Sequence, residues 1–145
     1  MSYLDQEVKH EVQNLDIGKH CFFIERNEDI RDNIRLMESF FSFKNNQINW
    51  AETRNHLRFD ESVFIETYKS LVLYKTILTS SNIIYINDGS LDIQIAFKGK
   101  FFSEILSYIL TNITQNHYFF MPQERACLVI RSLGYVDFGY SKTGV

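Results

Sequence analysis

The segment NIIYINDGSLDIQIAF constrains the fold of this chain more strongly than any other. Two runs rich in β-branched residues are joined at Asp88-Gly89, a dipeptide that hairpin turns prefer. In the second run apolar residues alternate with polar or small ones, and the apolar positions are Leu91, Ile93, Ile95 and Phe97. The sequence therefore predicts a β-hairpin near residues 82–98, with one buried face, inside an antiparallel sheet.

Apolar residues at helical spacing fill much of the remaining chain. The first predicted helix begins with a capping box, Ser2 followed by Asp5, and ends before Gly18. Asp60 has the position of an N-cap, and Pro122 has that of a first helical residue. The helices predicted from these patterns cover residues 3–16, 28–43, 61–80, 102–113 and 122–133.

Short apolar and aromatic runs predict further strands at residues 19–25, 118–121 and 135–140, the last of them at an edge of the sheet. The segment 44–59 is ambiguous and fits either a loop or a short helix over residues 48–57. With 145 residues, 45% of them hydrophobic, the chain is long enough to bury a core of its own. We expect a single compact α+β domain over residues 1–145, with about four to six helices packed on a small, mostly antiparallel sheet.

The charge and the cysteines restrict the partners and the compartment. The formal net charge is −3, which argues against direct binding to nucleic acid, because neutralising phosphates requires a concentrated basic surface. Cys21 and Cys127 form no CxxC pair, so neither a disulfide framework nor a thiolate metal site is indicated. No signal peptide or membrane-spanning run is recognisable. We expect a cytoplasmic protein that contacts no membrane.

The stretch from Phe23 to Phe43 is crowded with acidic residues and arginines. Carboxylates at helical spacing could hold a hard cation, but the interleaved arginines would repel it. Acid–arginine pairs three residues apart favour a salt-bridged helix face in solvent instead. The other interpretation is an acidic surface for a basic partner. Its candidate residues are Glu28, Asp29 and Asp32.

The sequence contains no recognisable catalytic motif. Its histidines lack zinc-ligand spacing, and its glycines form no phosphate-binding loop. A nucleophile could be assembled from Cys21 or Cys127 with His56 or His117, since such partners meet in space. Packing thiols are the simpler interpretation, with Cys127 on the apolar side of the 122–133 helix. We therefore expect no catalytic residue, no cofactor, no metal and no enzymatic activity.

The aromatic runs FFSF and YFFM exceed what one face of a helix or strand can bury. Most of these rings should lie in the core, because aromatic side chains dominate core burial. Aromatic residues surrounded by charge are also the usual composition of a binding hot spot. Phe43 and Trp50, which follow the acidic stretch in the sequence, are therefore candidate anchors for a partner.

In size, charge and composition the whole chain resembles the immunity proteins of bacterial toxin systems, especially those of contact-dependent growth inhibition. The resemblance carries no motif and assigns no residue a role. It implies a non-catalytic protein that binds a cognate toxin, often a nuclease, by covering its active site. Such a partner would be basic. The alternatives are a small hydrolase or nuclease with an unrecognised active site, or a homo-oligomeric regulatory subunit.

Overall fold

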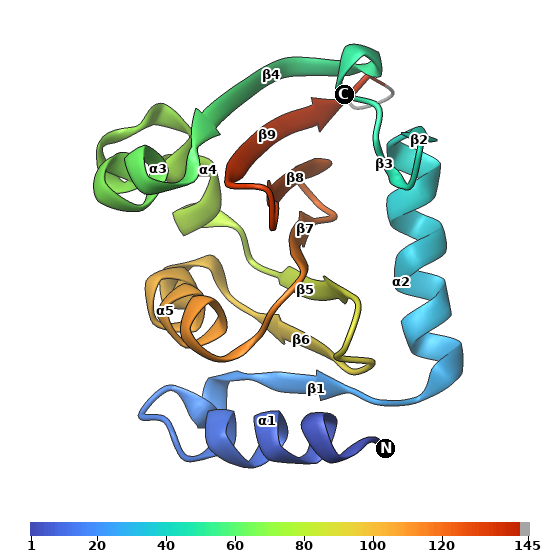
Figure 1. Ribbon diagram of the computed structural model, residues 1–145, viewed down its shortest axis with the longest axis vertical. Coiled ribbons are helices and arrows are strands. Elements are labelled where there is room, and N and C mark those ends of the chain that lie inside the picture. Colours follow the sequence, from blue (N-terminus) through green and yellow to red (C-terminus); the bar gives the residue numbers. More distant parts are fainter. Residues whose placement is uncertain (143–145) are drawn as a thin grey trace.

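An antiparallel sheet crosses the centre of the computed structural model, which describes residues 1–142 (Figure 1). Its strands are β1 (Phe22–Ile24), β4 (Thr53–Asp60), β5 (Ile83–Asp88), β6 (Gln94–Phe97), β7 (Asn116–Met121), β8 (Ala126–Ile130) and β9 (Tyr135–Ser141). Within the described residues, these seven strands lie in the order β1-β6-β5-β7-β8-β9-β4, and every neighbouring pair is antiparallel. A separate small hairpin pairs β2 (Phe43–Lys44) with β3 (Gln47–Ile48).

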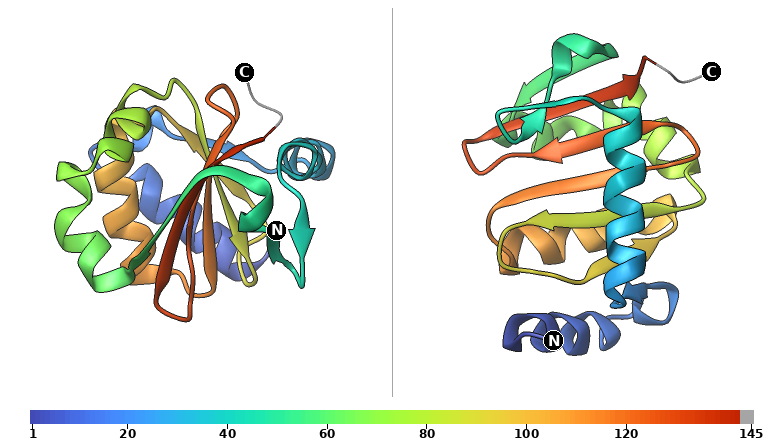
Figure 2. Two further views of the ribbon diagram at one scale, coloured as in Figure 1. Left: turned by 90° about the horizontal axis from the view of Figure 1, so that it is seen from above. Right: turned by 90° about the vertical axis from the view of Figure 1, so that its right-hand side faces the viewer.

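Helices cover both faces of the sheet, so the domain has three layers (Figure 2). The described residues form α1 (Tyr3–Gln13), α2 (Asn27–Phe40), α3 (Glu61–Thr67), α4 (Val72–Thr79) and α5 (Phe102–Asn112). The helices α3, α4 and α5 lie on one face, with α1 beside the β1 edge, whereas α2 and the small hairpin lie on the other. The predicted α+β class, with helices on an antiparallel sheet, is confirmed. No helix within residues 1–142 is long and apolar enough to cross a membrane.

The central strand β7 shows how the aromatic residues are buried. Phe119 and Met121 point into the large core beneath α3, α4 and α5. Tyr118 and Phe120 point into a second core beneath α2. Successive side chains of a strand alternate between faces, and both faces of β7 are covered. The run YFFM is therefore entirely buried, as the prediction of mostly core aromatics requires.

The predicted helix over residues 122–133 is wrong. Pro122 begins a tight turn, closed by a hydrogen bond from the Arg125 backbone N–H to the Pro122 carbonyl, and the chain returns as β8. A short continuous apolar run fits a strand buried on both faces as well as it fits a helix. Cys127 is buried in the core, as expected, but it belongs to this strand. The strand β9 lies between β8 and β4, so the prediction of an edge strand there is also wrong.

The predicted helix over residues 61–80 is divided in two. Asp60 caps α3 as predicted, through its carboxylate and the Ser62 backbone N–H. A 3-10 turn and an extended Leu71 then separate α3 from α4. A continuous helix would direct Lys75 toward the sheet. The break changes which residues face the sheet. The buried residues of this segment are Phe64, Tyr68, Leu73 and Ile77.

The ambiguous segment 44–59 is neither a simple loop nor the short helix over residues 48–57, of which only a single 3-10 turn at Trp50–Glu52 is present. It completes the small hairpin and then forms most of β4, the edge strand next to β9. The side chains of β4 are largely exposed, and its pairing is interrupted by a register shift between Arg54 and Leu57. Polar side chains and bulges are common on edge strands, because they hinder pairing with another chain. They also remove the apolar alternation that would have revealed the strand.

The predicted hairpin is present, but β6 begins at Gln94 rather than near Leu91. The buried Asp5 carboxylate explains this, because it accepts the backbone N–H groups of Asp92 and Ile93 at 2.8 and 3.4 Å. These donors are thereby taken from the sheet. Asp5 also completes the predicted capping box with Ser2 at the start of α1. One carboxylate thus joins the first helix to the hairpin.

Candidate protein-binding groove

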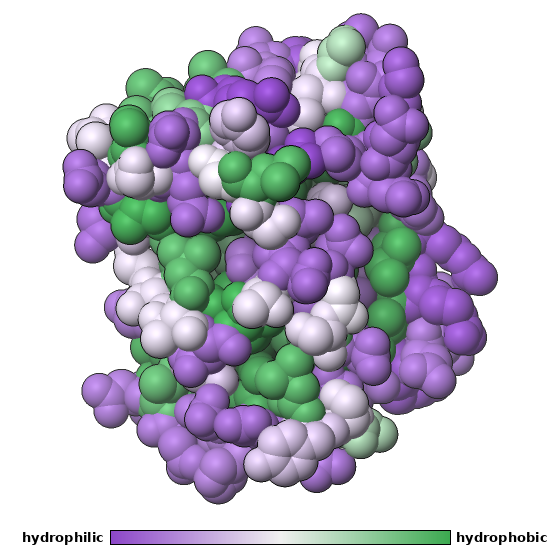
Figure 3. All heavy atoms as spheres, viewed as in Figure 1, coloured by the Kyte–Doolittle hydropathy of each residue, from purple (hydrophilic) through white to green (hydrophobic). Residues whose placement is uncertain are grey.

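A groove runs beside α2, between that helix and the turn end of the β5–β6 hairpin. It consists of two adjoining hollows of about 300 and 410 Å³ that share Ile34, Ile86 and Asn87. Phe43 and Tyr118 line the larger hollow. Figure 3 shows a strip of apolar side chains beside α2 with hydrophilic areas on both sides. The groove therefore has an apolar and aromatic floor, in which Ile34 and Phe43 are partly exposed and Ile86 and Tyr118 are buried.

The position of α2 creates this opening. The predicted apolar stripe of the helix faces the sheet, where Met37 is buried, but Ile30 and Ile34 remain only half-buried. Gln94 holds the helix in place: its side-chain amide donates to the Ile30 carbonyl at 3.2 Å and accepts from Asn33 at 2.8 Å. On the helix side of the groove Ile30 and Ile34 therefore stay partly accessible, whereas the apolar residues on the sheet side are buried.

The charged residues that line the groove are all acidic. They are Glu38 on α2, Asp88 at the end of β5, and Asp92 after the turn, and each is exposed. No lysine, arginine or histidine is among the lining residues. Within residues 1–142 no basic side chain forms an ion pair with any of the three. The groove is thus a negative region whose three carboxylates form no ion pair within the described residues.

Tyr118 lines the groove together with Asp88. Burial, the largest cause, and the charge of Asp88 raise the pKa of this phenol to about 12, and the charge of Arg131 acts in the opposite direction. A carboxylate raises the pKa of a neighbouring phenol because it disfavours the phenolate. The Tyr118 ring is buried in the floor of the groove, next to the partly exposed Phe43 and the exposed carboxylate of Asp88. This combination suits a ligand that carries positive charge on an apolar stem.

The predicted acidic residues of α2 lie elsewhere. Glu28, Asp29 and Asp32 are exposed, with 68%, 51% and 61% of their side-chain surfaces accessible, and none lines the groove. Arg26 lies 3.3 Å from Glu28 and 3.8 Å from Asp29, and Arg35 lies 3.7 Å from Asp32. Of the two acid–arginine pairs with three-residue spacing, Asp32 with Arg35 is present, whereas the predicted pair of Glu28 with Arg31 is wrong because Glu28 pairs with Arg26. These arginines offset much of the negative charge on this helix face.

The two predicted aromatic anchors are separated in the structure. Phe43 is partly buried and lines the groove, with its ring centroid 6.4 Å from that of Tyr118. Trp50 lies outside the groove and stacks on His56, with ring centroids 4.9 Å apart. The indole also covers Gly139, where a Cβ would come within 3.1 Å of the ring. The structure brings Phe43, but not Trp50, to the groove.

The three groove carboxylates are not among the site residues predicted from the sequence. Glu38 lies one helical turn after Ile34, which places both on the same side of α2 and could have been recognised. Asp88 was recognised only as a turn residue, and Asp92 only as a polar position of a strand. Their approach to α2 depends on pairing across the sheet, which the local sequence does not encode.

A second polar cluster lies on β4 and β9. Asp137 is fully buried and accepts hydrogen bonds at 2.7 Å from His56 Nε2 and at 2.7 Å from Arg58 Nε. A carboxylate that orients an imidazole is one element of general-base catalysis. Within residues 1–142, however, no hydroxyl or thiol is hydrogen-bonded to this histidine, and Trp50 covers its ring. These side-chain hydrogen bonds connect the polar edge strand β4 to β9.

The structure does not join either cysteine to a histidine. The Sγ atoms of Cys21 and Cys127 lie near backbone carbonyls, at 3.7 and 3.9 Å. Burial raises the pKa of Cys21 to about 11 and also raises that of Cys127. His117 instead accepts from the Tyr85 hydroxyl at 2.7 Å. Among the described residues, no group of three His, Cys, Asp or Glu side chains is placed to hold a metal ion.

Comparison with known proteins assigns the chain to no family. No protein-family model matches it, and no curated protein matches it. Its function is therefore inferred from the groove and from the charges around it.

Proposed function

We propose that this chain is a non-catalytic binding protein that neutralises a basic protein partner by holding a segment of it in the groove beside α2. One observation carries the proposal: three carboxylates, Glu38, Asp88 and Asp92, surround an apolar and aromatic floor that no basic residue lines. Lysine and arginine side chains match this chemistry, because their stems are apolar and their ends are positive.

The apolar floor of the groove and its three carboxylates have different roles in this proposal. Ile34 and Phe43 are partly exposed and provide apolar area that a bound segment removes from water, while Ile86 and Tyr118 are already buried beneath them. Aromatic anchors such as Phe43 contribute much of the binding energy at protein interfaces. The groove carboxylates provide steering and selectivity, since complementary charge accelerates the encounter and disfavours acidic competitors. The α2 carboxylates Glu28, Asp29 and Asp32 extend the acidic surface beyond the groove, reduced by their arginine partners.

The partner that we propose is a cognate bacterial toxin. This step follows from the resemblance in size, charge and composition to immunity proteins. A toxin that acts on nucleic acid needs a basic surface at its active site, because its substrate is a polyanion. An acidic groove that covers that surface would block the substrate without any catalysis by the binding protein. Inhibition would then require a stoichiometric complex.

The experiment begins with capture of the partner from the source cells and its identification as a stoichiometric, basic protein. Its affinity is then measured for the native chain and for the groove variant Glu38→Gln/Asp88→Asn/Asp92→Asn. The matched control is Asp16→Asn/Glu66→Gln/Glu104→Gln, which removes the same charge from exposed positions outside the groove. We expect the groove variant to bind at least about tenfold more weakly and the control to bind within about threefold of the native chain.

Three outcomes would overturn the proposal. The first is equal binding by the groove variant and the native chain. The second is a groove that mediates only self-association, detected as a dimer that the variant loses; this would favour the homo-oligomeric regulator. The third is hydrolase or nuclease activity of the purified chain that is abolished by His56→Ala, which would favour the enzyme.

A further inference from the structure

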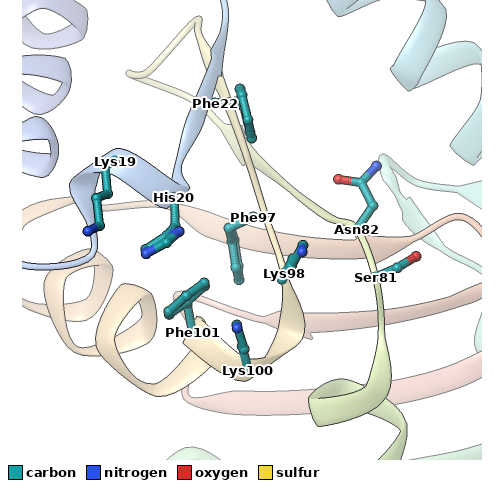
Figure 4. A pocket seen from close by; sticks show the side chains of 9 residues that line it. All are labelled: Lys19, His20, Phe22, Ser81, Asn82, Phe97, Lys98, Lys100 and Phe101. Atoms are coloured by element: carbon teal, nitrogen blue, oxygen red, sulfur yellow. The ribbon is translucent and has the colours of Figure 1, made fainter.

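A basic cavity lies at the opposite end of the β5–β6 hairpin from the groove. Its volume is about 310 Å³, which is within the range of small-molecule sites. The segments that form it are the start of β1, the connection from α4 to β5, and the connection from β6 to α5 (Figure 4). The lining residues are Lys19, His20, Phe22, Ser81, Asn82, Phe97, Lys98, Lys100 and Phe101. It shares none of them with the groove.

The charge of this cavity is opposite to that of the chain as a whole. Lys19, Lys98 and Lys100 are exposed, and no Asp or Glu lines the cavity. Within residues 1–142 no carboxylate lies within ion-pair distance of these three ammonium groups. Three like charges on one small cavity, in a protein with a net charge of −3, repel one another unless an anion is present. The cavity therefore favours a ligand with more than one negative charge.

Aromatic rings lie beside these charges. His20 stacks on Phe101 with ring centroids 4.6 Å apart, and the Lys100 ammonium lies 5.1 Å from the Phe101 centroid. Figure 4 shows Lys100 and Lys98 on the same side of the cavity as Phe97, with Phe22 at some distance from them. Phe22 is 71% exposed, which is unusual for a phenylalanine. An exposed ring near a cluster of ammonium groups can stack on a planar group of the same ligand.

We propose that this cavity binds a small phosphorylated molecule with a planar ring, of the nucleoside monophosphate class. Lys98 and Lys100 hold the phosphate, for which lysine is a common ligand as a point charge. The ring of Phe22 stacks on the base. This site is independent of the proposed function of the groove.

The test is isothermal titration calorimetry of the full chain at low salt. The probes are a nucleoside monophosphate, the corresponding nucleoside, ribose 5-phosphate and inorganic phosphate. We expect the nucleotide to bind most tightly, the phosphates without a base to bind more weakly, and the nucleoside not to bind. Added salt should weaken the binding of the nucleotide, because it screens the ammonium charges.

Variants distinguish the phosphate contact from the ring contact. Lys98→Gln/Lys100→Gln should weaken nucleotide binding at least about tenfold. The control Lys44→Gln/Lys75→Gln, which removes the same charge outside the cavity, should not. Phe22→Ala should weaken the nucleotide but not inorganic phosphate, and its folding can be checked by a thermal melt, since the ring is exposed. Absence of nucleotide binding, or binding that both lysine variants weaken equally, would overturn the proposal. Phe22→Ala that leaves nucleotide binding unchanged would also overturn it.

Discussion

Removing the two basic side chains that contact Asp137, His56 and Arg58, should destabilise the fold more than removing all three side chains of this cluster. Asp137 is 0% exposed, whereas the side chains of Arg58 and His56 are 47% and 29% exposed. If Asp137 is removed, the His56 and Arg58 side chains can therefore be solvated by water. If His56 and Arg58 are removed, the Asp137 carboxylate stays buried. The double variant His56→Ala/Arg58→Ala leaves a buried charge without a partner. In the triple variant Asp137→Val is added, which removes that charge as well.

The expected magnitudes follow from the contacts. Asp137 accepts from Arg58 at 2.7 and 3.3 Å and from His56 at 2.7 Å. Breaking a buried ion pair by removing one side costs about 3–5 kcal/mol of unfolding free energy, because the remaining charge stays desolvated. Replacing a whole buried pair by apolar residues is often neutral. We expect the double variant to lose about 3–5 kcal/mol and the third substitution to restore at least about 2 kcal/mol.

Urea denaturation at pH 7, followed by circular dichroism, measures these free energies. The slope with urea concentration must stay the same among the variants for the comparison to hold. We expect the triple variant to be more stable than the double variant. A loss below about 1 kcal/mol in the double variant, or a further loss on adding Asp137→Val, would refute the interpretation of Asp137 as a buried charge that depends on its two bases.

Two further predictions concern buried titratable groups. Burial lowers the pKa of His117 to about 4. Between about pH 6.5 and pH 4 the unfolded chain therefore binds a proton that the native chain does not. The free energy of unfolding should fall by up to about 3 kcal/mol as the pH falls through this window. The variant His117→Asn, which keeps an acceptor for the Tyr85 hydroxyl, should give a flatter profile in urea titrations, and an equally steep one would contradict the assignment. Cys21 and Cys127 should not react with a thiol reagent at pH 8 in the native state and should both react after denaturation, because burial keeps them protonated; fast native labelling would contradict this.

Local chemistry made part of this fold predictable. The capping box at Ser2 and the cap at Asp60 each lie within a few residues of sequence, and both are present in the structure. The Asp88-Gly89 dipeptide correctly indicated a hairpin, but Asp88 is the last residue of β5 and residues 89–93 form the connection to β6, so the predicted turn at this dipeptide is replaced by a longer loop. The apolar stripe of α2 was predictable for the same reason, although the helix ends at Phe40, before the predicted end at Phe43. Short-range spacing alone is enough to identify features of this kind.

The remaining elements depend on what covers them. β8 is buried on both faces, and its continuous apolar run therefore contained no alternation that distinguishes a strand from a helix. β4 is exposed and polar because it is an edge strand, and the sequence did not reveal which strand would be at the edge. The break between α3 and α4 depends on which side chains pack against the sheet, and the helical spacing of the local sequence does not indicate it.

The candidate sites also contain some residues that the local sequence predicts and others that only the tertiary structure brings together. Glu28, Asp29 and Asp32 were correctly expected on the exposed side of a helix, and Phe43 was a candidate that the structure brings to the groove. The groove itself needs Glu38 from α2 together with Asp88 and Asp92 from the hairpin, and the basic cavity likewise combines three distant segments. Residues far apart in the chain meet there only through sheet pairing, which the sequence patterns did not specify.

The measurement that tests the central proposal most directly is the association rate of this chain with its basic partner, followed by stopped flow across a range of salt concentrations. For the native chain the rate should fall steeply with added salt, because the charges steer the encounter. The variant Glu38→Gln/Asp88→Asn/Asp92→Asn should associate at least about tenfold more slowly at low salt and should depend less on salt, with an unchanged circular-dichroism melt. A rate equal to that of the native chain, with the same dependence on salt, would contradict the proposal that this groove receives a basic partner.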